Sequence, residues 1–183
     1  MELKTTDIVE AAGRIIIESG TDSLSIKELA DEMGIETPLL DSYFEKDDGI
    51  LMLLLKSLEN DIKQLISETR TVDRSPEEDL QLLFQNMHEL FKHKPYYLSV
   101  IFYTESKEKE SEFQKVLLRI KISVRTYLLE VINQGKKETV FKTRQASRVL
   151  VTNILGSFRS FMNEQRMISK MVKDLEILKT IND

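Results

Sequence analysis

Hydrophobic residues recur along the chain at the three- and four-residue spacing of amphipathic helices. In the first such segment Ile8, Ala12, Ile15 and Ile16 share one face, and Gly20 follows its predicted end. No segment alternates apolar and polar residues as a half-buried strand does, and no internal repeat is visible. We therefore predict an all-α protein.

The next two predicted helices are short and closely spaced. Ser25 and Glu28 have the spacing of a capping box, in which the hydroxyl accepts from the Glu28 amide. Gly34 supplies a sharp turn after this helix. Pro38 favours the start of the next one, with Thr37 as its predicted cap. Two short helices joined by a glycine turn and braced by a preceding helix predict a helix-turn-helix unit.

The rest of the chain predicts longer helices that pack as a bundle. The expected helices span residues 47–69, 75–94, 95–106, 111–134, 143–166 and 169–181. We therefore expect two domains, a helix-turn-helix head over residues 1–48 and a helical bundle over residues 49–183.

Composition narrows the possible chemistry. The 183 residues include no cysteine, which excludes a disulfide framework and a thiolate nucleophile. The two histidines, His88 and His93, lie five residues apart instead of the four of a zinc-protease helix. We expect no enzyme activity, no metal and no cofactor. The start of the chain lacks a signal-peptide pattern and no apolar run approaches 20 residues, so we expect a soluble cytoplasmic protein without membrane contact.

Charge is distributed unevenly. Residues 1–48 hold 13 acidic and four basic residues, whereas residues 49–183 hold 18 acidic and 22 basic residues. A negative head is the opposite of what a nucleic-acid surface predicts. A basic cluster follows residue 135, which we interpret as a solvated surface or as a site for an acidic partner. Its members are Lys136, Lys137, Lys142, Arg144 and Arg148.

The first fifty residues resemble the TetR family of bacterial transcriptional regulators. The matching residues keep an ungapped spacing over about 44 positions. They are Ile8, Val9, Ala11, Ala12, Ile15, Ile16, Gly20, Ser25, Ile26, Leu29, Ala30, Gly34, Ile35, Pro38, Leu40, Phe44, Ile50 and Leu51. Beyond residue 60 the resemblance is architectural, although residues 132–146 are similar to the loop before the family's dimerisation helix.

The resemblance implies that the head binds double-stranded operator DNA, with α-helical residues in the groove and lysines at phosphates. The residues it assigns to DNA are Lys4, Ser25, Lys27, Thr37, Pro38, Leu39, Ser42, Tyr43 and Lys46. The chain departs from the family at several phosphate-contacting positions, which are acidic here. These are Glu36, Asp41, Glu45 and Asp47. Acids at phosphate contacts weaken DNA binding, because most non-specific affinity comes from neutralising phosphates.

The resemblance also implies a pocket for a small-molecule effector and a homodimer formed by the terminal helices. Residues 84–103 are rich in aromatics, which form core packing or line such a pocket. The pocket candidates are Phe84, His88, Phe91, Phe102, Tyr103 and Tyr127. The candidates for the dimer interface are Leu150, Ile154, Phe158, Phe161, Leu175 and Leu178.

Two functions remain open from the sequence. The first is a ligand-responsive transcriptional regulator, a repressor that binds its operator as a dimer. The second is a dimeric module of the same fold that binds a ligand or a protein, with a degenerate acidic head that binds DNA weakly or not at all.

Overall fold

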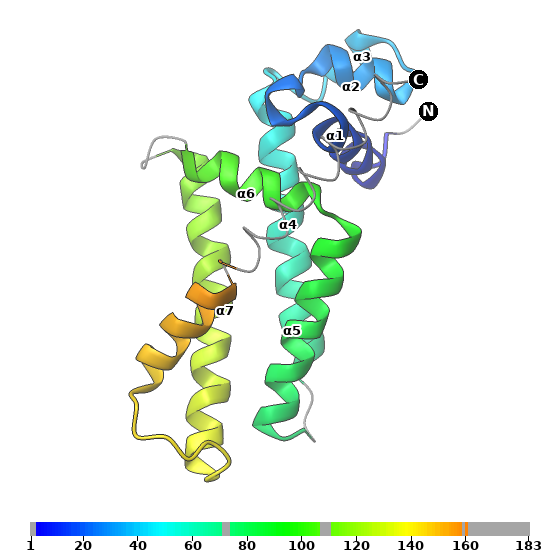
Figure 1. The fold of residues 1–183 in the computed structure, drawn as a ribbon. Coiled ribbons are helices and arrows are strands. Elements are labelled where there is room, and N and C mark those ends of the chain that lie inside the picture. Colours follow the sequence, from blue (N-terminus) through cyan, green and yellow to red (C-terminus); the bar gives the residue numbers. More distant parts are fainter. Residues whose placement is uncertain (1–2, 71–73, 107–110, 159, 161–183) are drawn as a thin grey trace, which may run out of the picture. The chain divides into compact units, whose positions relative to one another are not determined.

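The computed structural model describes residues 3–70, 74–106, 111–158 and 160, and every regular element in those ranges is helical. The elements in Figure 1 are α1 (Thr5–Ser19), η1 (Thr21–Ser23), α2 (Ile26–Met33), α3 (Thr37–Asp41), α4 (Asp48–Thr69), α5 (Pro76–His93), α6 (Tyr96–Ser106) and α7 (Glu112–Lys137). A further helix covers residues 147–158. The all-α prediction is confirmed. The chain forms two compact units, Met1–Tyr127 and Leu128–Asp183.

Helices α1, α2 and α3 form the predicted helix-turn-helix head. Gly34 ends α2 with a left-handed φ of 63°, a conformation that glycine adopts without steric cost. The Ile35 amide then donates to the Ala30 carbonyl at 3.0 Å, which closes the turn. Leu29, Ala30 and Leu40 are fully buried, so the apolar stripe predicted for α2 meets that of α3 in the core of the head.

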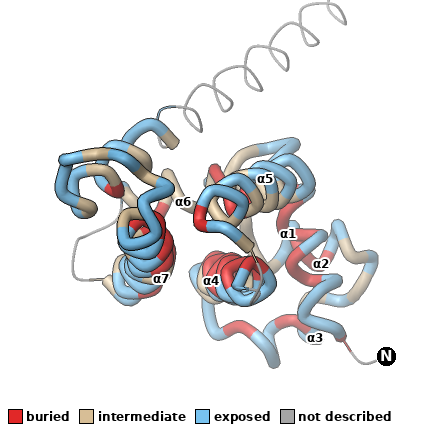
Figure 2. The backbone as a smooth tube through the Cα atoms, turned by 90° about the horizontal axis from the view of Figure 1, so that it is seen from below, coloured by how far each residue is buried: buried red, intermediate tan, exposed pale blue. Residues whose placement is uncertain are grey.

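Helix α4 leads from the head into the rest of the first unit. Buried residues recur along its 22 residues, as Figure 2 shows, and it packs against α1, α5 and α6. Gly49 lies in its first turn, where an added Cβ would come within 3.0 Å of the Phe44 ring. The start of α4 is therefore packed closely against the end of the helix-turn-helix.

A second contact joins the head to the helical region through α6. A Cβ added to Gly13 in α1 would lie 2.5 Å from the Cδ1 and Cε1 atoms of Tyr96, the first residue of α6. Only glycine permits this approach of the two helices. Tyr96 is 5% exposed, and its burial, followed by the charges of Asp61 and Glu10, raises the pKa of its hydroxyl to about 12.

The predicted helix starts are partly confirmed. Ser75 forms a complete capping box with Glu78, with Pro76 at the first helical position. Thr37 is the first residue of α3 instead of its cap, which is Glu36. The helix predicted from Thr143 begins at residue 147, because the Thr143 hydroxyl accepts from the nearby Gln145 amide instead of capping a helix.

The predicted end of α7 at Gly135 was wrong, since the helix continues to Lys137. Gly135 serves instead as a contact: an added Cβ would lie 2.2 Å from Cδ2 of Phe141, and the Phe141 amide donates to the Gly135 carbonyl at 3.0 Å. Thr139, with φ of 62°, takes the left-handed conformation in the turn that follows. The helix predicted over residues 169–181 lies outside the described residues.

None of the helices within the described ranges combines the length and apolar character that crossing a membrane requires.

Candidate nucleic-acid interface and helical pocket

The exposed side of α3 and of the turn after it carries the predicted groove-facing residues. Leu39 is 41% exposed and Tyr43 is 54% exposed, so two large hydrophobic side chains face solvent here. Leu40 and Phe44, their neighbours in sequence, are buried and hold the segment on the head. This alternation presents Leu39, Ser42 and Tyr43 outward from a rigid support, which is the geometry that base contacts in a groove require.

The remaining predicted DNA contacts are distributed over the head. Lys4, Lys27 and Lys46 are exposed, at the starts of α1 and α2 and before α4. Ser25 caps α2, its hydroxyl oxygen accepting from the Glu28 amide at 3.1 Å. This cap leaves the Ser25 hydroxyl proton available to a phosphate, because a hydroxyl both donates and accepts. Pro38 is exposed and Thr37 half-buried, at the start of α3.

Two of the acidic residues of the head have structural partners. Glu32 Oε1 lies 2.5 Å from Nε of Arg14, which ties α2 to α1. Asp47 Oδ1 accepts from the backbone amide of Ile26 at 2.7 Å. The sequence could not reveal the second contact, because the two residues are 21 positions apart. In contrast, Glu36, Asp41, Glu45 and Asp48 are exposed and add negative charge to the surface of the head.

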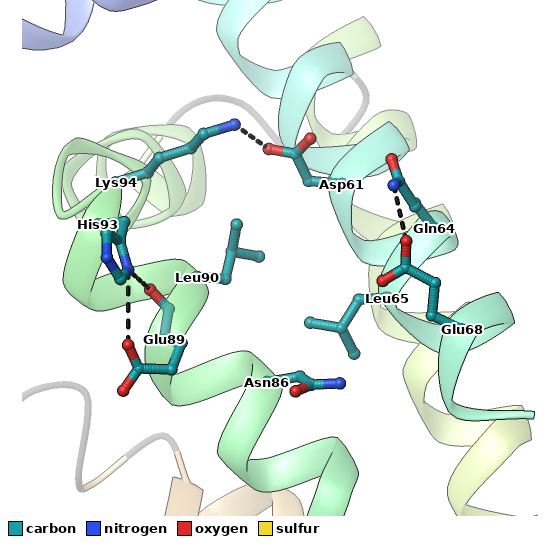
Figure 3. Close-up of a pocket in the computed structure, with 9 residues that line it drawn as sticks. All are labelled: Asp61, Gln64, Leu65, Glu68, Asn86, Glu89, Leu90, His93 and Lys94. Carbon is teal, nitrogen blue, oxygen red and sulfur yellow. Dashed lines mark hydrogen bonds and ion pairs between the residues drawn. The ribbon is translucent and has the colours of Figure 1, made fainter.

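A groove of about 350 Å³ lies between α4 and α5 (Figure 3). Its lining residues are Asp61, Gln64, Leu65, Glu68, Asn86, Glu89, Leu90, His93 and Lys94. Lys94 Nζ donates to Asp61 Oδ2 at 2.7 Å across the groove, and Gln64 donates to Glu68 at 2.7 Å. Three carboxylates against one lysine make the groove acidic. It therefore suits a neutral or cationic molecule better than an anionic one.

Asp61 also connects the groove to α6. The Tyr97 hydroxyl donates to Asp61 Oδ2 at 2.7 Å and lies 2.9 Å from the Ser57 hydroxyl. Tyr97 is fully buried, and this burial raises the pKa of its hydroxyl, so it stays a neutral donor. It follows Tyr96, which touches Gly13 in the head. A displacement of Asp61 can therefore be transmitted through Tyr97 and its neighbour Tyr96 to the contact with α1.

None of the six predicted pocket residues lines this groove. Tyr127 is buried, with the Arg70 guanidinium 5.4 Å from its ring centroid, and His88 is exposed. The other four, Phe84, Phe91, Phe102 and Tyr103, are partly exposed. Their role in effector binding stays a prediction. The sequence did not indicate this groove, because charged residues spaced four apart on a helix are typical of a solvent-exposed face.

No group of side chains among the described residues has the arrangement of a metal site.

A buried ion pair joins α4 to α7 within the first unit. Glu59 is 6% exposed and accepts two hydrogen bonds from Arg119, Nε to Oε1 and Nη2 to Oε2, both at 2.9 Å. Lys63 Nζ donates to the same carboxylate at 2.8 Å. These bonds, chiefly those from Arg119, lower the pKa of Glu59 to about 2 although its burial opposes the shift.

The second unit contains the predicted dimer residues. In the helix over residues 147–158, Leu150, Ile154 and Phe158 are partly exposed, and Val149 is 48% exposed. The role of this helix in a subunit contact stays a prediction. The other three candidates, Phe161, Leu175 and Leu178, lie outside the described residues.

Comparisons with known proteins agree with this fold. No protein-family model matches the chain. A TetR transcription regulator from Haloarcula marismortui has a similar structure, with a TM-score of 0.77 and 26% identity over 90% of this chain and 86% of that one. FadR from Bacillus subtilis, solved in complex with stearoyl-CoA, gives a TM-score of 0.74 with 18% identity over 91% of this chain and 89% of that one.

One curated relative matches in sequence. The HTH-type transcriptional regulator PksA of Bacillus subtilis (strain 168) is 29% identical over 85 residues, which are 46% of this chain. The match spans 42% of the length of that relative. Together with the buried scaffold and exposed α3 of the head, these likenesses show that the chain has the fold of transcriptional regulators of the TetR family and is similar to them.

Proposed function

We propose that this protein is a ligand-responsive transcriptional repressor that binds operator DNA as a homodimer through its helix-turn-helix head. The observation that carries the proposal is the exposure of Leu39, Ser42 and Tyr43 on a segment fixed by the buried Leu40 and Phe44. Both side chains project from this fixed segment, with Leu39 41% and Tyr43 54% exposed, so they are free to contact base edges in a groove. We propose that residues 1–48 form the DNA-binding domain and that residues 49–183 bind effector and partner subunit.

In this proposal dimerisation sets the distance between two heads. Two recognition segments can enter successive major grooves only when they lie about 34 Å apart, or a multiple of that. The partly exposed face of residues 147–158 supplies part of the subunit contact. An effector that prefers the wrongly spaced dimer lowers DNA affinity by its differential binding free energy.

The effector reaches the head through α4 and α6. The groove between α4 and α5 contains Asp61, which the Tyr97 hydroxyl contacts, and Tyr96 packs on Gly13 of α1. A neutral or cationic molecule that displaces Lys94 from Asp61 would therefore shift α6 against the head. FadR of Bacillus subtilis was solved with stearoyl-CoA, but the phosphates of such a ligand would face carboxylates in this groove.

Fluorescence anisotropy of labelled DNA from upstream of the protein's own gene tests the proposal. We expect nanomolar affinity at physiological salt for that DNA and much weaker binding to a scrambled duplex of equal length. The logarithm of the DNA association constant should fall only slowly with the logarithm of the salt concentration, because few lysines and several acids face the DNA. Equal and weak binding to both duplexes would refute the proposed function.

A further inference from the structure

The groove between α4 and α5 is lined at the same residue spacing on both helices (Figure 3). The residues with this spacing are Asp61, Leu65 and Glu68 on α4, and Asn86, Leu90 and His93 on α5. Residues at positions i, i+4 and i+7 lie on one face of a helix, so each helix turns a single face to the groove. Two regular surfaces of the first unit therefore form the groove.

Along α4 the groove passes from an acid to an apolar side chain and then to a second acid. Asp61 and Glu68 are seven residues apart, so their Cα atoms are separated by about 10 Å along the helix axis. Leu65 lies between them and is buried, and Leu90 of α5 points toward it across the groove (Figure 3). A molecule that lies along this face meets a carboxylate at each end and an apolar surface in the middle.

The Asp61 end of the groove provides a setting for an ammonium group. Lys94 Nζ donates to Asp61 Oδ2 at 2.7 Å and lies 5.5 Å from the centroid of the Tyr97 ring. A carboxylate beside an aromatic face attracts an ammonium group through both its charge and the electrons of the ring. Lys94 belongs to the chain itself, so its contact shows only which chemistry this end accepts. Its side chain is partly exposed and can move into solvent.

The Glu68 end of the groove has a carboxylate without a cation. Glu68 is exposed and accepts from the side-chain amide of Gln64 at 2.7 Å. None of the described lysines, arginines or histidines pairs with Glu68, whereas Asp61 pairs with Lys94 and Glu89 with Lys92. The second carboxylate on this face of α4 is therefore available to a cation from outside the chain.

We infer that the groove binds an elongated dication, a linear aliphatic diamine whose two ammonium groups are about 10 Å apart. One ammonium group replaces Lys94 at Asp61, the other pairs with Glu68, and the hydrocarbon between them covers Leu65 and Leu90. The groove volume of about 350 Å³ is within the range of small-molecule sites. This inference rests on the proposed function and deepens it, because it names the chemical class of the effector.

Isothermal titration calorimetry of the full chain tests the inference with three probes. Octamethylenediamine has an ammonium group at each end of its chain, n-octylamine has the same chain with one ammonium group, and trimethylenediamine is too short to reach both carboxylates. We expect octamethylenediamine to bind at least tenfold more tightly than either of the others, the order of one charge-assisted hydrogen bond. Equal affinities for octamethylenediamine and n-octylamine would overturn the inference.

Three variants assign the two ends. Glu68→Gln should weaken octamethylenediamine binding about tenfold and leave n-octylamine binding unchanged. Glu77→Gln is the matched control, because it removes the same charge from an exposed position in the first turn of α5 outside the groove, and it should change neither affinity. Lys94→Gln should tighten the binding of both amines, since the competing ammonium group is gone. Equal effects of Glu68→Gln and Glu77→Gln, or weaker amine binding by Lys94→Gln, would contradict the assignment.

The outcomes separate this inference from the proposed function. Specific DNA binding by a protein that does not bind octamethylenediamine would overturn the inference and leave the proposed function standing. Diamine binding with the expected loss in Glu68→Gln, but with no specific DNA binding, would support the inference and overturn the proposed function. Diamines also bind DNA phosphates, so a diamine effect on DNA affinity supports an effector role only if Glu68→Gln abolishes it. An effect of equal size in Glu68→Gln would overturn that role.

Discussion

Glu59 is the group whose removal should most clearly alter the stability of the first unit. Its side chain is 7% exposed and its carboxylate accepts from Arg119 and Lys63. The substitution Glu59→Gln keeps the size of the side chain but removes the charge. Arg119 then loses its bidentate partner, and the contact between α4 and α7 weakens.

The pKa of Glu59 gives the magnitude. It falls from 4.5 to about 2 in the folded protein, and one pKa unit corresponds to about 1.4 kcal/mol. The full shift would stabilise the folded state by about 3 kcal/mol. The side chains of Arg119 and Lys63 are 52% and 56% exposed, so solvent screens the pair. We therefore expect Glu59→Gln to lower the free energy of unfolding by about 1–2 kcal/mol at pH 7.

The sign of the pH dependence follows from the lowered pKa. The contribution of Glu59 is fully present above pH 4.5 and is lost as the pH falls towards about 2. Urea unfolding followed by circular dichroism, at fixed protein concentration, should show a gap between wild type and Glu59→Gln at pH 7 that narrows at pH 3. Lys63→Ala is the control, with an expected cost of about 0.3–0.5 kcal/mol for an exposed pair on one helix. Equal stability of wild type and Glu59→Gln at pH 7, or a gap that stays constant with pH, would refute the assigned ion pair.

Three further predictions concern the head, its contact with α6 and the second unit. Gly13→Ala should lower the free energy of unfolding by about 1–3 kcal/mol, because its Cβ would lie 2.5 Å from the Tyr96 ring, whereas Gly156→Ala, with nothing within 4 Å, should be neutral or stabilising in urea titrations. Similar effects of the two alanines would contradict the close approach of α1 and α6. Tyr43→Ala should weaken specific DNA binding at least tenfold in anisotropy assays. The melting temperature should not change, because the Tyr43 side chain is 54% exposed. Unchanged DNA affinity would show that Tyr43 is not part of the interface. Ile154→Asp should raise the dimer dissociation constant at least tenfold in sedimentation equilibrium, and an unaltered dimer would exclude this face from the subunit contact.

Local patterns were sufficient to predict the helix-turn-helix scaffold. Leu29, Ala30 and Leu40 follow the helical spacing of a buried stripe, and all three are fully buried. Ser25 and Glu28 have the spacing of a capping box, and the Ser25 hydroxyl accepts from the Glu28 amide at 3.1 Å as this spacing predicts. These features depend on neighbours within four residues, which is why the sequence alone predicts them.

Features that join distant residues could not be predicted in this way. Arg119 pairs with Glu59 across 60 residues, and Asp47 reaches Ile26 across 21. The sequence shows each charge but not its partner. The same limit explains why the end of α7 was predicted at the wrong residue. The sequence does not show that Phe141 packs on Gly135.

The acidity of the head has a partly structural explanation. Glu32 pairs with Arg14, and Asp47 binds the Ile26 amide, so two of the acidic residues of the head stabilise the head itself. Asp47→Lys, which would introduce a base where the TetR family commonly has one, would also remove this bond. Any gain in DNA affinity from Asp47→Lys therefore has to be compared with Asp47→Ala.

The central claim is that a dimer of this chain reads DNA through the exposed residues of α3 and the following turn. Selection of duplexes from a random-sequence pool by the full-length protein, followed by sequencing, tests it most directly. We predict enrichment of a palindrome whose half-site centres are about one helical turn, or a multiple of it, apart. A pool that shows no enriched sequence after selection at physiological salt would contradict the claim.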